Sequence, residues 1–94
     1  MVTKAFVVKE KLHVFPMEAP WTYVPIPDSK VPDVPRGGWG SIPVMATVGK
    51  TTWRTSLFPI KGKQYFIPIK KSVCRKESLV IGEEVTVRYV LASK

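Results

Sequence analysis

The segment from Thr51 to Val73 constrains the fold more than any other part of the chain. Its side chains alternate between one face and the other with a period of two, which is typical of strands that bury one face. The apolar face contains Trp53 and Leu57 before a turn, and Ile67 and Ile69 after it. The pattern therefore predicts a β-hairpin that leads into a short helix.

The length and composition predict one globular domain over residues 1–94. The chain has 94 residues, of which 45% are hydrophobic and 11% are aromatic, and this is enough for one core. A chain of this size buries only somewhat more than about 60% of the surface that its unfolded form exposes, so it has little room for an enclosed catalytic cavity. We therefore expect function at a surface or groove.

Further strands and one helix follow from the same pattern. A Gly-led pair, Gly49 and Lys50, predicts a type II′ turn between two strands, and Pro59 is expected to end the second of them. After Pro68 the apolar spacing becomes helical and predicts a helix over about residues 70–78. The expected strands are Lys4–Val14, Trp21–Ile26, Ile42–Val48, Thr51–Phe58, Gln64–Ile69 and Glu84–Leu91.

These elements predict a mostly β fold, namely a small closed or partly open β-barrel of about six strands with one short helix before the last strand. Closure is favoured because a chain this small cannot leave many strand edges unprotected. Trp21 and Trp53 are expected in the core, although large aromatic residues in a barrel can also line a ligand pocket. The segment from Pro27 to Ser41, rich in Pro and Gly, is expected to be a long loop at the barrel mouth.

Three separated motifs also carry a resemblance that covers nearly the whole chain. The sequences WTYVPIP from Trp21, WRTSLFP from Trp53 and GKQYFIPIKKSV from Gly62 occur in the order seen in a small prokaryotic β-barrel family known only as a domain of unknown function. In that family a Gly-Asp pair precedes the last strand, whereas this chain has Gly82 and Glu83. The resemblance implies a closed barrel with one helix, often fused to or found beside bacteriocin-protection-type domains, and it implies no known activity.

A second, partial resemblance covers residues 66–90. The sequence FIPIKKSVCRKESLVIGEEVTVRYV is similar to the strand, helix and strand of AbrB-like swapped-hairpin transcription factors, which bind DNA as dimers. In this chain the upstream strands could supply the missing half of the barrel, and the basic DNA-contacting loops have no clear counterpart. We therefore interpret the similarity as a strand-helix-strand arrangement that any short crossover in a barrel needs, and not as a sign of DNA binding.

The sequence predicts no catalytic residues, no metal site and no cofactor, and it favours a protein that is not an enzyme. Arg75 and Lys76 beside Cys74 could favour a thiolate, but the only histidine, His13, lies far away in sequence. An inert, at least partly buried thiol is the favoured interpretation of Cys74. One histidine with scattered carboxylates does not supply the ligands of a metal site. One cysteine can form neither an internal disulfide nor a cysteine-based zinc site.

The favoured function is therefore a noncatalytic binding or interaction module that uses the barrel mouth to bind a protein partner or a small ligand. Trp39, which lies between glycines, is either a plug for the barrel end or an exposed stacking platform, and the plug is slightly favoured. The candidate binding residues are Arg36, Trp39, Trp53 and Arg54.

The net charge of +8, from 15 Lys and Arg against 7 Asp and Glu, supplies the alternative of nucleic-acid binding through a basic helix and strand face. The expected contacts are Lys70, Lys71, Arg75 and Lys76. Basic residues spread through a chain more often form a solvated surface, which is favoured here.

The apolar stretches are too short to span a membrane, and the N-terminal sequence lacks the apolar block of a signal peptide. We therefore expect a cytoplasmic protein without a membrane partner.

Overall fold

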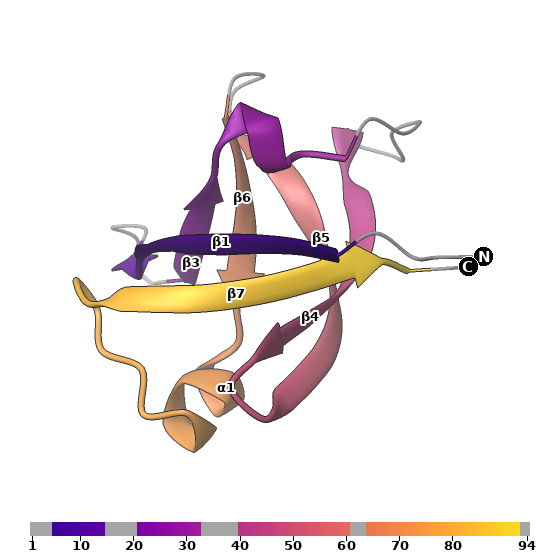
Figure 1. Cartoon of the computed structure of the whole chain (residues 1–94). Helices are drawn as coiled ribbons and strands as arrows, with labels where there is room; N and C mark the ends of the chain where they lie inside the picture. Colours follow the sequence, from indigo (N-terminus) through magenta and orange to yellow (C-terminus); the bar gives the residue numbers. More distant parts are fainter. Residues whose placement is uncertain (1–4, 15–20, 33–39, 61–63, 93–94) are drawn as a thin grey trace.

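The computed structural model describes residues 5–14, 21–32, 40–60 and 64–92. They form a seven-stranded antiparallel sheet that curves into a nearly closed barrel, with one short α-helix before the last strand (Figure 1). The predicted fold class is thus confirmed. The elements are β1 (Ala5–Lys11), β2 (His13–Val14), β3 (Thr22–Ile26), the 3-10 turn η1 (Asp28–Lys30), β4 (Ile42–Val48), β5 (Thr51–Ile60), β6 (Gln64–Ile69), α1 (Lys71–Lys76) and β7 (Glu84–Leu91).

The strand pattern of the sequence places the core inside the barrel. Every second residue of β4 is buried, from Ile42 to Val48, as expected for a strand with one face toward a core. Gly49 then adopts a φ of +57°, and Lys50 has no positive φ, so the hairpin turn has the predicted type II′ character. The strands β4, β5 and β6 are neighbours in that order, which makes the expected three-strand meander.

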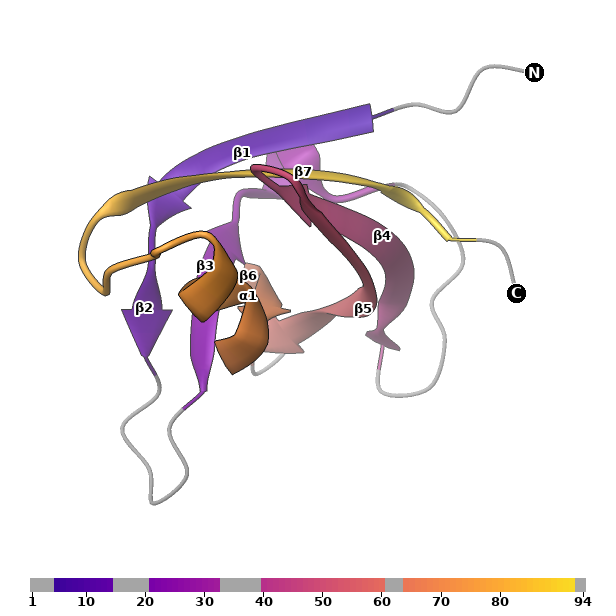
Figure 2. The same ribbon diagram turned by 90° about the horizontal axis from the view of Figure 1, so that it is seen from below.

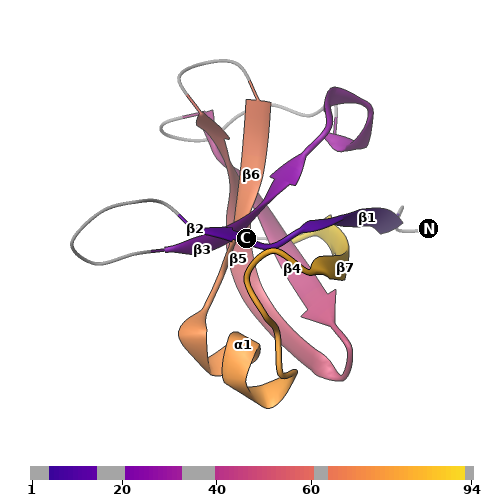
Figure 3. The same ribbon diagram turned by 90° about the vertical axis from the view of Figure 1, so that its left-hand side faces the viewer.

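One extended segment closes the barrel, because β1 and β2 lie at opposite ends of the strand order β1-β7-β4-β5-β6-β3-β2. Leu12 alone separates these two strands in the chain. Its N–H donates to the carbonyl of Glu83 at 3.0 Å, and its carbonyl accepts from the N–H of Gly82 at 2.8 Å. Figure 3 shows β1 and β2 extending to opposite sides of the view, with β2 beside β3. The segment thus pairs with β7 first and with β3 afterwards.

The two ends of the barrel are covered by different elements. Helix α1 lies across one end (Figures 1 and 2), where Val73 is buried in the core. The carboxylate of Glu77, just after α1, accepts from the Thr51 hydroxyl at 2.6 Å and from the Lys50 N–H at 3.3 Å. At the other end the hydroxyl of Tyr89 donates to the carbonyl of Lys30 in η1.

Within the described ranges, no helix has the length and apolar character needed to cross a membrane.

The structure corrects four expectations about single elements. Strand β5 continues through Pro59 to Ile60, because β4 pairs only as far as Leu57 and a residue without an N–H is tolerated where a strand has one neighbour. Helix α1 is shorter than predicted and ends before Ser78, whose φ is +52°. The expected single strand Lys4–Val14 is divided into β1 and β2 at Leu12, whose backbone groups pair with Gly82 and Glu83 instead of a strand.

The fourth correction concerns Trp21, which was expected in the core and is instead 53% exposed. It precedes β3 and is out of phase with the inward-facing Val24 and Ile26. The side chain therefore belongs to the outer surface of the barrel wall.

We expect Gly49→Ala to lower the free energy of unfolding by about 2 kcal/mol. About half of this cost is the strain of a left-handed backbone in a residue with a Cβ. The rest arises because the new Cβ would lie 2.0 Å from Oε1 of Glu77 and would displace that carboxylate from Thr51. Urea denaturation measures the change.

The control for backbone strain is Gly82→Ala, since Gly82 has a φ of +92° and a Cβ there would meet nothing within 4 Å. In a Glu77→Ala background, the cost of Gly49→Ala should fall to that of Gly82→Ala. An unchanged cost would show that the contact with Glu77 adds nothing to the strain.

We expect Tyr89 to make the protein less stable at alkaline pH. Burial raises the pKa of this phenol above its ordinary value, which is about 10 in an unfolded chain. The unfolded state therefore loses the proton first, so stability is complete below about pH 10 and falls above it by up to about 1.4 kcal/mol per pH unit. Tyr89→Phe should cost about 1 kcal/mol at neutral pH, and this difference from the natural protein should shrink as the pH rises.

Phe6→Leu is the matched control, because the Phe6 ring stacks on Tyr89 with centroids 5.4 Å apart and carries no ionisable group. Its cost should not depend on pH. A Tyr89→Phe difference that stays equally constant would contradict the prediction.

Candidate functional site

The wall of the barrel opens where β5 and β6 diverge. The two strands share three described residue pairs, from Phe58 opposite Phe66 to Ile60 opposite Gln64. Before this point β5 pairs with β4 as far as Leu57, whereas β6 pairs with β3 from Tyr65 to Ile69. A cleft of about 390 Å³ lies in this region, next to the start of α1.

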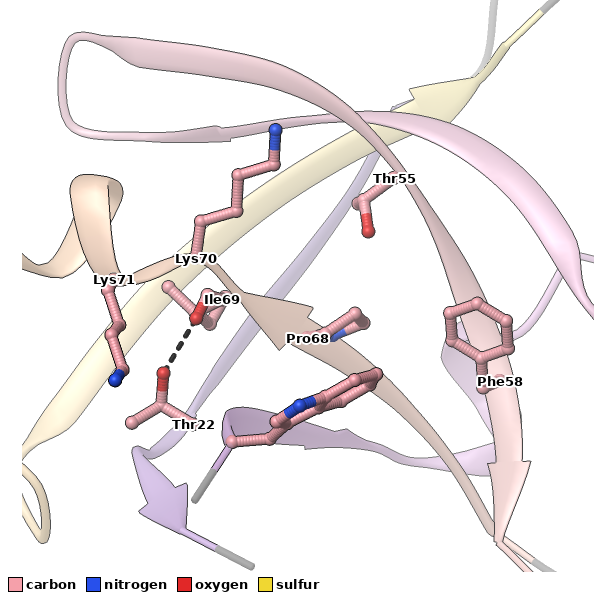
Figure 4. Close-up of a pocket in the computed structure, with 8 residues that line it drawn as sticks. Thr22, Thr55, Phe58, Pro68, Ile69, Lys70 and Lys71 are labelled. Atoms are coloured by element: carbon pink, nitrogen blue, oxygen red, sulfur yellow. Dashed lines mark hydrogen bonds between the residues drawn. The ribbon is translucent and has the colours of Figure 1, made fainter. Parts of the chain in front are cut away.

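The cleft has an apolar wall, two hydroxyl groups and two cations. Figure 4 shows Phe58 on β5 across from Pro68 on β6, with Lys70 and Lys71 at the end of the cleft that leads into α1. Both outward-facing and inward-facing positions of the strands contribute, as expected for an opening between strands. The lining residues are Trp21, Thr22, Thr55, Phe58, Pro68, Ile69, Lys70 and Lys71.

Thr22 fixes one side of the cleft to the end of β6. Its hydroxyl donates to the carbonyl of Ile69 at 2.6 Å (Figure 4) and lies 3.5 Å from the Sγ atom of Cys74. Pro68, on the same strand, has no N–H and cannot donate a ladder hydrogen bond. This edge of β6 is therefore poorly suited to pair with an added strand.

A row of aromatic rings continues from the cleft across β5, β6, β3 and β2, and its member Phe66 is buried, with 8% of its surface exposed. The ring centroids of Phe58 and Phe66 are 5.9 Å apart, those of Phe66 and Tyr23 are 5.5 Å apart, and those of Tyr23 and His13 are 5.4 Å apart. A second hollow of about 360 Å³ is lined by Trp21, Phe58, Pro59 and Phe66. Trp21 and Phe58 thus border both hollows, and the apolar surface extends beyond the cleft.

The residues that the sequence suggested for the barrel mouth do not lie together in one site. Arg36 and Trp39 lie outside the described residues. Trp53 is 7% exposed and belongs to the core, where its Nε1 atom is buried without a hydrogen-bond partner in the described part of the chain. Arg54 is exposed on the outer face of β5, next to the cleft residue Thr55. Neither Trp53 nor Arg54 lines the cleft.

The four predicted nucleic-acid contacts all lie at the start of α1 or on it, and all four are exposed. Only Lys70 and Lys71 line the cleft. Arg75 and Lys76 lie in the last turn of α1. The basic residues therefore form one exposed cluster, of which one half borders the apolar cleft.

Cys74 and His13 have separate surroundings. Cys74 is a free, half-buried thiol beside the Thr22 hydroxyl, and His13 stacks on Tyr23. No group of three or more His, Cys, Asp or Glu side chains that could hold a metal ion occurs within residues 5–14, 21–32, 40–60 and 64–92.

Sequence reasoning missed Phe58, Pro68, Thr22, Thr55 and Ile69 as lining residues. A signal was present for the first two, because Phe58 is out of phase with the inward-facing Leu57 and Pro68 is out of phase with Ile67 and Ile69. No signal in the sequence showed that β5 and β6 diverge, which is what brings these residues together.

The comparisons with known proteins identify a family and no closer relative. No curated protein and no solved structure matches the chain. The family described as Domain of unknown function (DUF1905) matches residues 9–88, a range that runs from β1 into β7. The protein therefore belongs to the DUF1905 family.

Proposed function

We propose that this protein is a noncatalytic binding module and that its binding site is the cleft between β5 and β6. The observation that carries this proposal is an apolar opening in the barrel wall bordered by Trp21, which leaves 53% of its surface exposed. Exposed large aromatic residues beside a concave apolar surface are typical of binding sites. A cytoplasmic location remains part of the proposal.

A small ligand suits the cleft better than a protein partner does. Its volume of about 390 Å³ lies within the range of roughly 300–1,000 Å³ that is common for small-molecule sites. Pro68 makes the edge of β6 a poor template for an added peptide strand. The cleft therefore replaces the loop from Pro27 to Ser41 as the proposed location of the site.

A neutral apolar dye tests this proposal. We expect phenylnaphthylamine to bind with an increase in fluorescence and a one-to-one stoichiometry. Trp21→Ala should weaken the binding by about fivefold, because an aromatic contact contributes roughly 1 kcal/mol beyond its buried area. Fluorescence titration measures both quantities.

The matched control is Ile81→Ala, since Ile81 is an apolar residue with 55% exposure that does not line the cleft. It should leave the dissociation constant unchanged. The proposal fails if the dye does not bind, or if both variants weaken binding equally.

Nucleic-acid binding is the second candidate, and the exposed cluster of Lys70, Lys71, Arg75 and Lys76 favours it. If these four cations contact phosphates of a single strand, affinity should fall by roughly 50-fold between about 50 mM and about 200 mM salt. Fluorescence anisotropy with a labelled oligonucleotide measures this dependence.

Replacing the four cations by Ala should then remove most of the salt dependence. The charge-matched control replaces Lys9, Lys11, Lys30 and Lys50, which are exposed elsewhere. Equal losses in the two variants would indicate attraction by the net charge alone and would exclude a specific interface on α1.

A further inference from the structure

The two lysines at the cleft carry positive charge that no described residue of the protein neutralises. Neither Lys70 nor Lys71 forms an ion pair with a carboxylate in the described part of the chain. Among the residues that the structure describes, none with an acidic side chain lines the cleft. The nearest acidic residue along α1, Glu77, accepts hydrogen bonds from Thr51 and Lys50. This end of the cleft is therefore complementary to an anion.

The lysine side chains leave the junction of β6 and α1 on different sides. Figure 4 shows Lys70 on the side of Thr55 and Lys71 on the side of Thr22. The Thr22 hydroxyl already donates to Ile69, whereas the Thr55 hydroxyl forms no hydrogen bond with a described residue. Thr55 can thus offer a donor or an acceptor to an occupant.

The rest of the wall suits a flat apolar group. Trp21, Phe58 and Pro68 line the cleft, and rings of these kinds pack favourably against an aromatic ring. The charged and apolar parts adjoin within one volume of about 390 Å³. A single small molecule can therefore contact both parts.

We propose that the cleft binds a small aromatic anion, with its ring against Trp21, Phe58 and Pro68 and its carboxylate, sulfonate or phosphate group at the end of the cleft that Lys70 and Lys71 line. This inference rests on the proposed function of the cleft and adds the class of ligand. It also gives Lys70 and Lys71 a role that does not require nucleic acid. An anion held at the rim of an apolar cleft interacts with these cations more strongly than it would in open solvent.

A pair of dyes that differ by one anionic group tests the inference. Anilinonaphthalene sulfonate has the ring skeleton of phenylnaphthylamine and adds a sulfonate. We expect the sulfonate to bind the natural protein roughly tenfold more tightly than the neutral dye, as contacts with two exposed charges allow. In the double variant Lys70→Gln and Lys71→Gln, the two dyes should bind within about twofold of each other.

The matched control is the double variant Lys9→Gln and Lys11→Gln, which removes two exposed lysines of β1 and should retain the preference for the sulfonate. Cooperative thermal unfolding of each variant shows that the dyes report on folded protein. If the neutral dye binds and depends on Trp21 but the sulfonate gains nothing, the anion is excluded while the proposed binding module stands. If neither dye binds, both proposals fail.

Competition identifies which anionic group the cleft accepts. Naphthoate and naphthyl phosphate carry the same ring with a carboxylate or a phosphate, and each is titrated against the bound sulfonate dye. Displacement by one or both supports the inference and names the preferred group. Displacement by neither, at concentrations where unsubstituted naphthalene displaces the neutral dye, overturns it.

Discussion

The barrel depends on Leu12, at which one extended segment leaves one edge of the sheet and joins the other. Leu12 belongs to no strand, yet its N–H and carbonyl both form hydrogen bonds, to Glu83 and Gly82. Its side chain is 1% exposed and lies in the core. The chain can therefore change its pairing partner from β7 to β3 without burying an unpaired backbone group. Both edges of the sheet are formed by this one continuous segment.

Two such changes of partner divide the barrel into halves. The first is at Leu12, and the second is in β5, which pairs with β4 as far as Leu57 and with β6 from Phe58 onward. Hydrogen bonds to the connection between α1 and β7 close the first junction. At the second, β5 and β6 diverge, and the cleft occupies the space between them. The site is thus a consequence of how the barrel closes.

The sequence determines the strands better than it determines this junction. Strands β4, β6 and β7 have their predicted bounds, because alternation identifies a strand with one buried face from local residues alone. Pro59 misled the prediction, since whether a proline ends a strand depends on whether the neighbouring strand still pairs there. For the same reason the sequence could place Lys70 and Lys71 on a basic helix but not at the rim of a cleft, because the position of the rim depends on the path of β5.

The position of the two lysines follows from how α1 covers the barrel end. Val73 is buried in the core and Glu77 is held by Thr51 and Lys50 of the β4–β5 hairpin, so the start of α1 has a fixed orientation relative to both β5 and β6. An occupant of the cleft would contact Thr55 and Phe58 on one strand and Pro68 and Ile69 on the other. It would thereby connect the halves at the junction that the backbone leaves open. Because binding to the folded state alone stabilises that state, closure of the barrel and binding in the cleft are linked through the same residues.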